Sequence, residues 1–289
     1  IWGDYKIKGD SSHSSSKGRA VIYIYQDDTW RVSKILTAKD GEENDQFGYS
    51  VAIHNDLAVV CARGEDNNES GCDYIGAAYI FQRNGNTWTE IQKIVANDRE
   101  SRDFFGEDVS IYKDYIIVGA YGEDNSNSAN NYFGAAYIFT QDDNTWKQVQ
   151  KLKATQRNQS DYYGYAVAIN ETHAVVGAYG DDEAGNNLGA VYIYLKQNDE
   201  WNKSIKINGS VTYFGYYVTI IDNTIIVKNN SDIEYYYPLF STISGYIKTP
   251  QGSPQIGSNI IFTNDGGSTS TDRYGYFTHE VPIGWSGIV

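Results

Sequence analysis

The sequence has 289 residues with 26 Tyr, 28 Gly, 4 Pro and no Met, a composition that favours short strands joined by glycine turns over long helices. Its net charge of −14 argues against nucleic acid as a partner, because phosphate contacts require clusters of Lys and Arg that are absent here. No apolar run reaches the roughly 18 residues of a membrane span, so we expect no direct membrane insertion of this segment.

The N-terminal segment predicts an incomplete group of β-strands. "AVIYIY" and the residues around Trp30 have the Val, Ile and Tyr content of strands. The words "WGDY" at Trp2–Tyr5 and "VGAY" at Val118–Tyr121 align, which predicts that the sequence opens after the first strand of a repeating unit.

A long repeat follows this segment. "DQFGYSVAIHNDLAVVCARGED" begins at Asp45, and related stretches begin at Asp103, Asp161 and Thr212. Each full unit contains four apolar runs bounded by Gly, Asn and Asp, and short turns such as "HND" and "QRNGNT" join them at hairpin lengths. The fourth run is marked by Trp88, Trp146 and Trp201. The repeat therefore predicts four-stranded antiparallel meanders.

We predict an all-β fold, in which residues 1–240 form a β-propeller of four-stranded antiparallel blades. The predicted blades span about 1–38 (partial), 40–96, 97–154, 155–207 and 209–239 (partial). Either the two partial blades close a small ring together, or further blades lie outside this sequence. We favour further blades, because both partial blades supply a third strand, "AVIYIY" and "IEYYY". Residues 241–289 predict an incomplete small β-sandwich domain.

The recurring words carry a resemblance. "FG" at Phe47-Gly48, "VGAYG" at Val118–Gly122 and "GAAYIF" at Gly76–Phe81 resemble the FG-GAP repeats of the integrin α-subunit propeller and of bacterial and archaeal surface proteins. The resemblance covers residues 1–239 and implies a seven-bladed ring on an extracellular or cell-surface protein that binds ligands or mediates adhesion. The tail is similar to carboxypeptidase-regulatory-like or prealbumin-like domains.

One departure from that family concerns calcium. Integrin-type blades carry a loop of the form D-x-D-x-D-G-x-x-D between the first two strands, whereas the connections here are as short as "HND", "YKD" and "NET". Such turns cannot wrap a cation that needs six to eight oxygen ligands, so the calcium residues of the family are not carried over.

The strand order places the acidic loops after the second strands on the same face as the loops that precede each FG. These loops hold nearly all of the net charge of −14, which draws cations or basic partners. Oxygen-bearing side chains at alternate positions are the candidates for a Ca²⁺ site. The candidates are Glu65, Asp66, Glu69, Glu123, Asp124, Asp181, Asp182 and Glu183. The alternative is that these residues are turn formers in solvated loops.

Tyrosines beside the same loops are the candidates for ligand binding, because their rings stack on sugars or on side chains of a partner. They are Tyr49, Tyr74, Tyr121, Tyr132, Tyr162 and Tyr179. The alternative is packing between blades.

Covalent modification is suggested by two further patterns. Cys61 and Cys72 flank one loop and could form a local disulfide. Glycosylation sequons begin at Asn68, Asn158, Asn170, Asn202, Asn208 and Asn229, which favours a secreted protein.

The sequence contains no recognisable catalytic motif, so we expect a protein that is not an enzyme. The first hypothesis is a binding or adhesion protein that recognises a protein or glycan through its acidic, Tyr-edged face, with Ca²⁺ as the candidate cofactor. The second is a self-associating structural subunit of a surface layer or extracellular filament. A polysaccharide-active enzyme is the third, because a catalytic carboxylate pair is defined by its separation in space.

Overall fold

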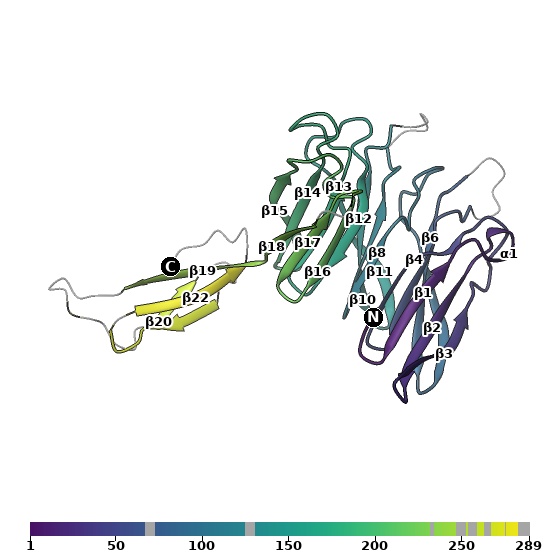
Figure 1. The fold of residues 1–289 in the computed structure, drawn as a ribbon, viewed down its shortest axis with the longest axis horizontal. Coiled ribbons are helices and arrows are strands. Elements are labelled where there is room, and N and C mark those ends of the chain that lie inside the picture. The colour runs from purple at the N-terminus through teal and green to yellow at the C-terminus, as the bar shows by residue number, and fades with distance from the viewer. Residues whose placement is uncertain are drawn as a thin grey trace.

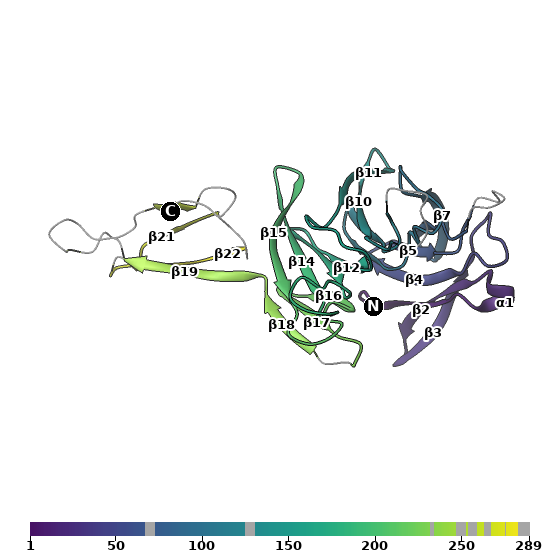
Figure 2. The same cartoon turned by 90° about the horizontal axis from the view of Figure 1, so that it is seen from above.

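The computed structural model describes residues 1–66, 73–124, 131–231, 234–246, 253, 259–262, 267–274 and 276–282. Five small antiparallel sheets, called blades 1 to 5 in chain order, are arranged around a common axis as a β-propeller (Figures 1 and 2). In the described part of the chain, no helix is long and apolar enough to cross a membrane.

Blades 2 to 4 have four strands each, which confirms the meander that the repeat predicts. Blade 2 contains β4 (Phe47–His54), β5 (Leu57–Ala62), β6 (Ala77–Asn84) and β7 (Thr87–Ile94). Blade 3 contains β8 (Val109–Tyr112), β9 (Tyr115–Ala120), β10 (Ala135–Asp142) and β11 (Thr145–Leu152). Blade 4 contains β12 (Tyr163–Ile169), β13 (His173–Ala178), β14 (Ala190–Gln197) and β15 (Glu200–Asn208).

The first and last blades have three strands. Blade 1 contains β1 (Tyr5–Asp10), β2 (Arg19–Gln26) and β3 (Thr29–Leu36), with the short α1 (His13–Ser16) between β1 and β2. Blade 5 contains β16 (Tyr217–Ile221), β17 (Thr224–Lys228) and β18 (Glu234–Pro238). The seven-bladed ring that the resemblance implies stays a prediction.

The alignment of "WGDY" with "VGAY" is wrong. Trp2 forms an antiparallel bridge with Tyr5, as His54 pairs with Leu57 in blade 2, so Trp2 occupies the end of an inner strand. The glycine of "VGAY" corresponds instead to Gly9 near the end of β1. The shared Gly misled the alignment because it has two different causes: the turn at Gly3 has a positive φ of 50°, whereas Gly119 leaves room for the carbonyl oxygen of Gly164.

The tail forms two short ladders. β19 (Phe240–Tyr246) pairs with β22 (Tyr276–Pro282), and β20 (Asn259–Phe262) pairs with β21 (Gly267–Ser270). Figures 1 and 2 show them extending away from blade 5. The predicted β-sandwich domain stays a prediction.

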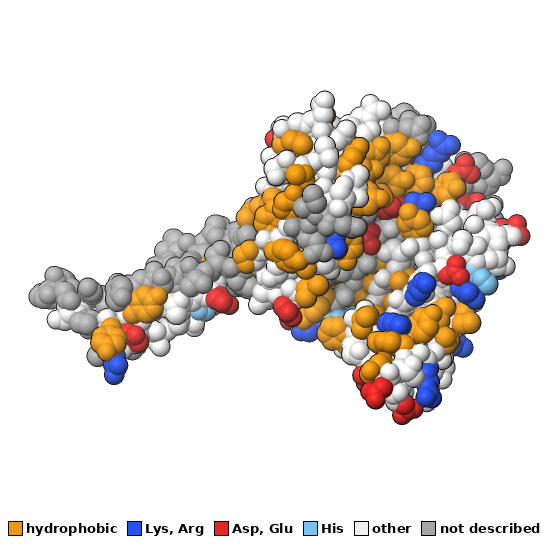
Figure 3. Space-filling view, viewed as in Figure 1, with side chains coloured by type: hydrophobic (Ala, Val, Ile, Leu, Met, Phe, Trp, Pro, Cys, Tyr) orange, Lys and Arg blue, Asp and Glu red, His pale blue; other side chains and the backbone are white. Residues whose placement is uncertain are grey.

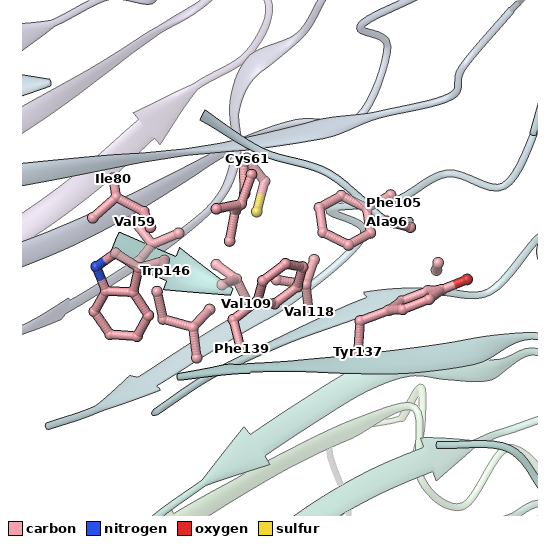
Figure 4. Packing of buried hydrophobic residues seen from close by; sticks show 14 of the residues in the cluster. Val59, Cys61, Ile80, Ala96, Phe105, Val109, Val118, Tyr137, Phe139 and Trp146 are labelled. Carbon is pink, nitrogen blue, oxygen red and sulfur yellow. The ribbon is translucent and has the colours of Figure 1, made fainter. Parts of the chain in front are cut away.

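The hydrophobic core lies between neighbouring blades. Between blades 2 and 3, Val59 and Ile80 face the larger Phe105, Phe139 and Trp146, and all five are at least 98% buried (Figure 4). Similar clusters join the other neighbouring blades. At each of these four interfaces, the later blade thus contributes large aromatic side chains and the earlier blade smaller residues.

Small residues at the end of the second strand allow neighbouring blades to approach closely. A Cβ atom added to Gly119 would lie 1.9 Å from the carbonyl oxygen of Gly164, the FG-type glycine of the next blade. Gly177 faces Gly215 in the same way, at 2.1 Å. The corresponding residue of blade 5 is Lys228, so the face of blade 5 that points away from blade 4 lacks the glycine found in blades 3 and 4.

A glutamine clamp joins the outer strands. The amide of Gln150 donates to the carbonyl oxygen of Trp201 at 2.7 Å and accepts from its N–H at 2.9 Å. Gln92 makes the same pair of bonds with Trp146. All three marker tryptophans therefore pack in the core, and Trp146 and Trp201 also receive this backbone clamp.

Candidate functional site on the loop face

The loops after the second strands lie beside the loops that precede the inner strands, and together they form what we call the loop face. The N–H of Gly122 donates to the carbonyl oxygen of Asp103 at 3.1 Å, and that of Gly180 donates to Asp161 at 3.2 Å. The opposite face, which carries the turns between first and second strands, is called the turn face. This placement agrees with the strand-order argument.

Aromatic rings form a continuous band across the loop face from blade 2 to blade 5. Phe104 stacks on Tyr121 with ring centroids 4.8 Å apart and planes 9° from parallel. Tyr162 stacks on Tyr179 at 4.7 Å and 4°. Figure 3 shows hydrophobic side chains, a class that includes tyrosine, gathered near the top of the propeller. We call the following residues the aromatic band: Tyr74, Phe104, Tyr121, Tyr132, Tyr162, Tyr165, Tyr179, Tyr213 and Tyr216.

Five of the six predicted tyrosines belong to this band, and the sixth, Tyr49, lies beside it. The sequence reasoning missed Phe104, Tyr165, Tyr213 and Tyr216. Their signal was present in the repeat, because Phe104 and Tyr213 directly precede an FG pair. Within the band, Tyr74 and Tyr216 are exposed by 37% and 38%, and Tyr49 beside it by 36%, so part of the aromatic surface remains in contact with solvent.

Left-handed backbone positions hold the band in place. Phe104 and Tyr162 have φ values of 55° and 52°, which bulky residues rarely adopt. The N–H of Phe104 donates to the carbonyl oxygen of Tyr74 at 3.0 Å, and that of Tyr162 donates to Tyr132 at the same distance. Strained residues that bridge two blades fix the rings before any ligand arrives.

A buried ion pair supports one end of the band. Arg63 donates to Glu107 Oε2 at 2.8 Å, and its guanidinium lies 3.8 Å from the ring centre of Tyr49. The Tyr49 hydroxyl donates to Glu107 Oε1 at 3.3 Å. Burial, followed by the charge of Glu107, raises the pKa of Tyr49 to about 12, so this hydroxyl stays protonated at neutral pH.

Three of the metal candidates bind lysines within their own blade. Glu65 Oε1 lies 2.8 Å from Lys93 Nζ, and Glu123 Oε1 lies 2.6 Å from Lys151 Nζ. Asp181 has the equivalent place in blade 4 and pairs with Lys206. Glu65, Glu123 and Asp181 are at least 96% buried, and these ion pairs join the acidic loops to the fourth strands.

The remaining metal candidates are more accessible. Asp182 and Glu183 are exposed, Asp66 and Asp124 are half-buried, and Glu69 lies outside the described residues. Among the residues that the structure describes, no group of three or more His, Cys, Asp or Glu side chains is arranged to hold a metal ion.

A second set of buried carboxylates was not predicted. Asp45, Asp103 and Asp161 stand two residues before the aromatic residue of each FG-type pair, and each accepts the N–H of the third residue before it at 2.7 Å. Burial raises the pKa of Asp103 to about 7, and the charge of Glu123 adds to this effect. Burial likewise raises the pKa of Asp45 and of Asp161 to about 6. The regular spacing of these residues was the signal that could have identified them.

The predicted modification sites differ in their surroundings. Cys61 is a free, fully buried thiol, and Cys72 lies outside the described residues, as does Asn68. Asn158, Asn202 and Asn208 are exposed, whereas Asn170 is half-buried and Asn229 is 5% exposed. The side-chain oxygens of Asn170 and Asn229 accept backbone N–H groups of the following turns.

Comparison with known proteins identifies the repeat. The FG-GAP repeat family matches residues 30–81, 88–139 and 146–194, more than half of the chain. The chain belongs to the FG-GAP repeat family. The family assignment agrees with the four-stranded blades and their positive-φ glycines.

Other comparisons add little to this FG-GAP assignment. The crystal structure of the computationally designed Ika4 protein is similar with a TM-score of 0.44 and 10% sequence identity, over 70% of this chain and 95% of that one. A search of curated proteins finds no match.

Proposed function

We propose that this FG-GAP propeller is a non-catalytic binding or adhesion protein of the cell surface or extracellular space. Its ligand is a protein or glycan that contacts the aromatic band. The observation that carries the proposal is the continuity of the band over four blades, with rings held by interblade hydrogen bonds and edges left exposed. Rigid aromatic surface of this kind contributes large contact area at low entropic cost.

Charge adds selectivity to this surface. The acidic loops on this face also carry Asp66, Asp124, Asp182 and Glu183, which are half-buried or exposed, and the net charge of the chain is −14. Basic or neutral ligands are therefore favoured over acidic ones. The proposal includes Ca²⁺ as a bound cation. Its ligands would come from the accessible carboxylates Asp66, Asp124, Asp182 and Glu183, and titration calorimetry with Ca²⁺ tests this binding.

The experiment measures binding to a glycan array and to extracellular matrix proteins. Tyr121→Leu removes the ring at the centre of the band, which contacts Phe104, Tyr132, Tyr162 and Tyr165. We expect this variant to weaken binding by about tenfold or more, because central aromatic residues dominate such interfaces. The matched control is Tyr25→Leu, which changes an exposed tyrosine of blade 1 outside the band. Equal binding by both variants would show that the ligand lies elsewhere.

Exposed apolar side chains on blades 1 and 5 support a second candidate function, a self-assembling surface subunit. Val32 and Ile35 of blade 1 are exposed by 59% and 48%, and Tyr217 and Ile221 of blade 5 by 46% and 54%. Contacts between two different faces of identical chains produce rings or filaments. Electron micrographs of the purified protein test this function, and a monodisperse monomer at high concentration would contradict it.

A further inference from the structure

The turn face contains a pocket that the aromatic band does not explain. Its volume is about 780 Å³, within the usual range for small-molecule sites. The inner strands of all five blades end around it with equivalent residues. These residues are Trp2, His54, Tyr112, Asn170 and Ile221. The preceding residue is isoleucine in every blade, and Ile53, Ile111 and Ile169, which are at least 92% buried, give the pocket an apolar floor.

Blades 1 to 3 supply an aromatic wall. The Trp2 and His54 rings lie 3.9 Å apart, and the His54 and Tyr112 rings lie 4.7 Å apart. His54 is 4% exposed, and no hydrogen bond joins its ring to another described residue. Trp2 is 43% exposed, so much of its surface remains in contact with solvent.

His54 contributes a neutral imidazole to this lining. Its two neighbouring rings cover the faces of the imidazole, while the residue still lines the pocket. Burial, and then the charge of Lys113, lowers the pKa of His54, so the ring is neutral at pH 7. A neutral imidazole carries one donor and one acceptor nitrogen.

Blades 4 and 5 supply a polar wall. The Asn170 Oδ1 atom already accepts the N–H groups of Thr172 and His173, which leaves its NH₂ group as a donor. Asp222 and Asn223 line the pocket from the exposed turn of blade 5, and no ion pair joins Asp222 to another described residue. The wall therefore combines amide donors with a carboxylate acceptor.

We propose that this pocket binds a saccharide, with the apolar face of a pyranose ring against Trp2 and its hydroxyl groups toward Asp222, Asn223 and Asn170. A saccharide has both an apolar face and closely spaced hydroxyls that donate and accept, and the pocket matches each of these with a separate wall. An apolar ligand would leave the polar wall unpaired, at a cost of about 1–3 kcal/mol per group. The site lies on the turn face and is independent of the function proposed for the aromatic band.

Ligand-observed NMR on the full chain tests the proposal. The probes are glucose, galactose, mannose, N-acetylglucosamine and N-acetylgalactosamine at millimolar concentration, with tetramethylammonium as a cationic probe. We expect saturation transfer to at least one saccharide. Trp2→Leu is expected to weaken its affinity about tenfold, the effect of losing one aromatic contact. Transfer to no saccharide, or to tetramethylammonium alone, would overturn the proposal.

Three further variants keep the result interpretable. Asp222→Asn lies in an exposed turn, so it should leave folding intact while it weakens saccharide binding. Trp30→Leu is the matched control, because Trp30 lies on the outer strand of blade 1 beside Tyr25. Tyr121→Leu separates the two sites and should leave saccharide binding in this pocket unchanged. Equal affinities of Trp2→Leu, Asp222→Asn and Trp30→Leu would refute the assignment.

Discussion

Replacing Asp103 by Asn should stabilise the protein at pH 8 and not at pH 4. The carboxylate is 3% exposed, its pKa is raised from 3.8 to about 7, and it lies near the charge of Glu123. Its one backbone bond, from the N–H of Glu100, is retained by an amide oxygen. Asn therefore removes the buried charge and keeps the acceptor.

The magnitude follows from the pKa. A shift of about three units corresponds to about 4 kcal/mol of difference between the protonation states. Because the folded pKa lies above the unfolded value, the folded state binds this proton more tightly. The contribution is fully present below pH 3.8 and is lost as the pH rises through about 7. In the wild type, the free energy of unfolding should therefore fall by up to about 1.4 kcal/mol per pH unit within that window from this group.

Urea unfolding followed by circular dichroism at pH 4, 6 and 8 measures the effect. We expect Asp103→Asn to be more stable than the wild type by up to about 4 kcal/mol at pH 8, with little difference at pH 4. The control is Asp142→Asn, which changes an exposed carboxylate paired with Lys147. A loss of stability at pH 8 that disappears with a chelator would refute the reasoning, because it would mean that a bound cation keeps Asp103 ionised.

Three other changes test the fold and the surface. Gln150→Leu should lower the free energy of unfolding, measured in urea, by about 2–4 kcal/mol, because two buried backbone groups lose their partner. Lys34→Leu, at the equivalent position of blade 1, is the control and should change the free energy of unfolding little. Gly177→Val should prevent cooperative thermal unfolding, since even a Cβ atom would lie 2.1 Å from a carbonyl oxygen of blade 5; a normal transition would contradict the interblade packing. In protein expressed by a secretory eukaryotic host, peptide mass analysis should find Asn202 glycosylated and Asn229 unmodified, because only Asn202 is exposed. Modification of Asn229 would mean that the turn held by its side chain opens.

The repeat in the sequence was sufficient to predict the blades. Four apolar runs per unit, hairpin-length turns and a marker tryptophan fix local strand pairing, which depends on residues close together in the chain. The same pattern predicted which tyrosines share a face, because strand order alone decides on which side each loop emerges. It failed at Trp2, where a short segment offered too few residues to fix the register.

Tertiary structure decided the roles of individual side chains. Glu65 and Lys93 are 28 residues apart, and only the pairing of strands shows that they form an ion pair within one blade. The charges of Asp103 and Glu123 belong to different loops, so their mutual repulsion could not be read from either loop. The turn-face pocket needs one residue from each of five blades, and its aromatic and polar walls arise from differences between repeats that only the circular arrangement brings together.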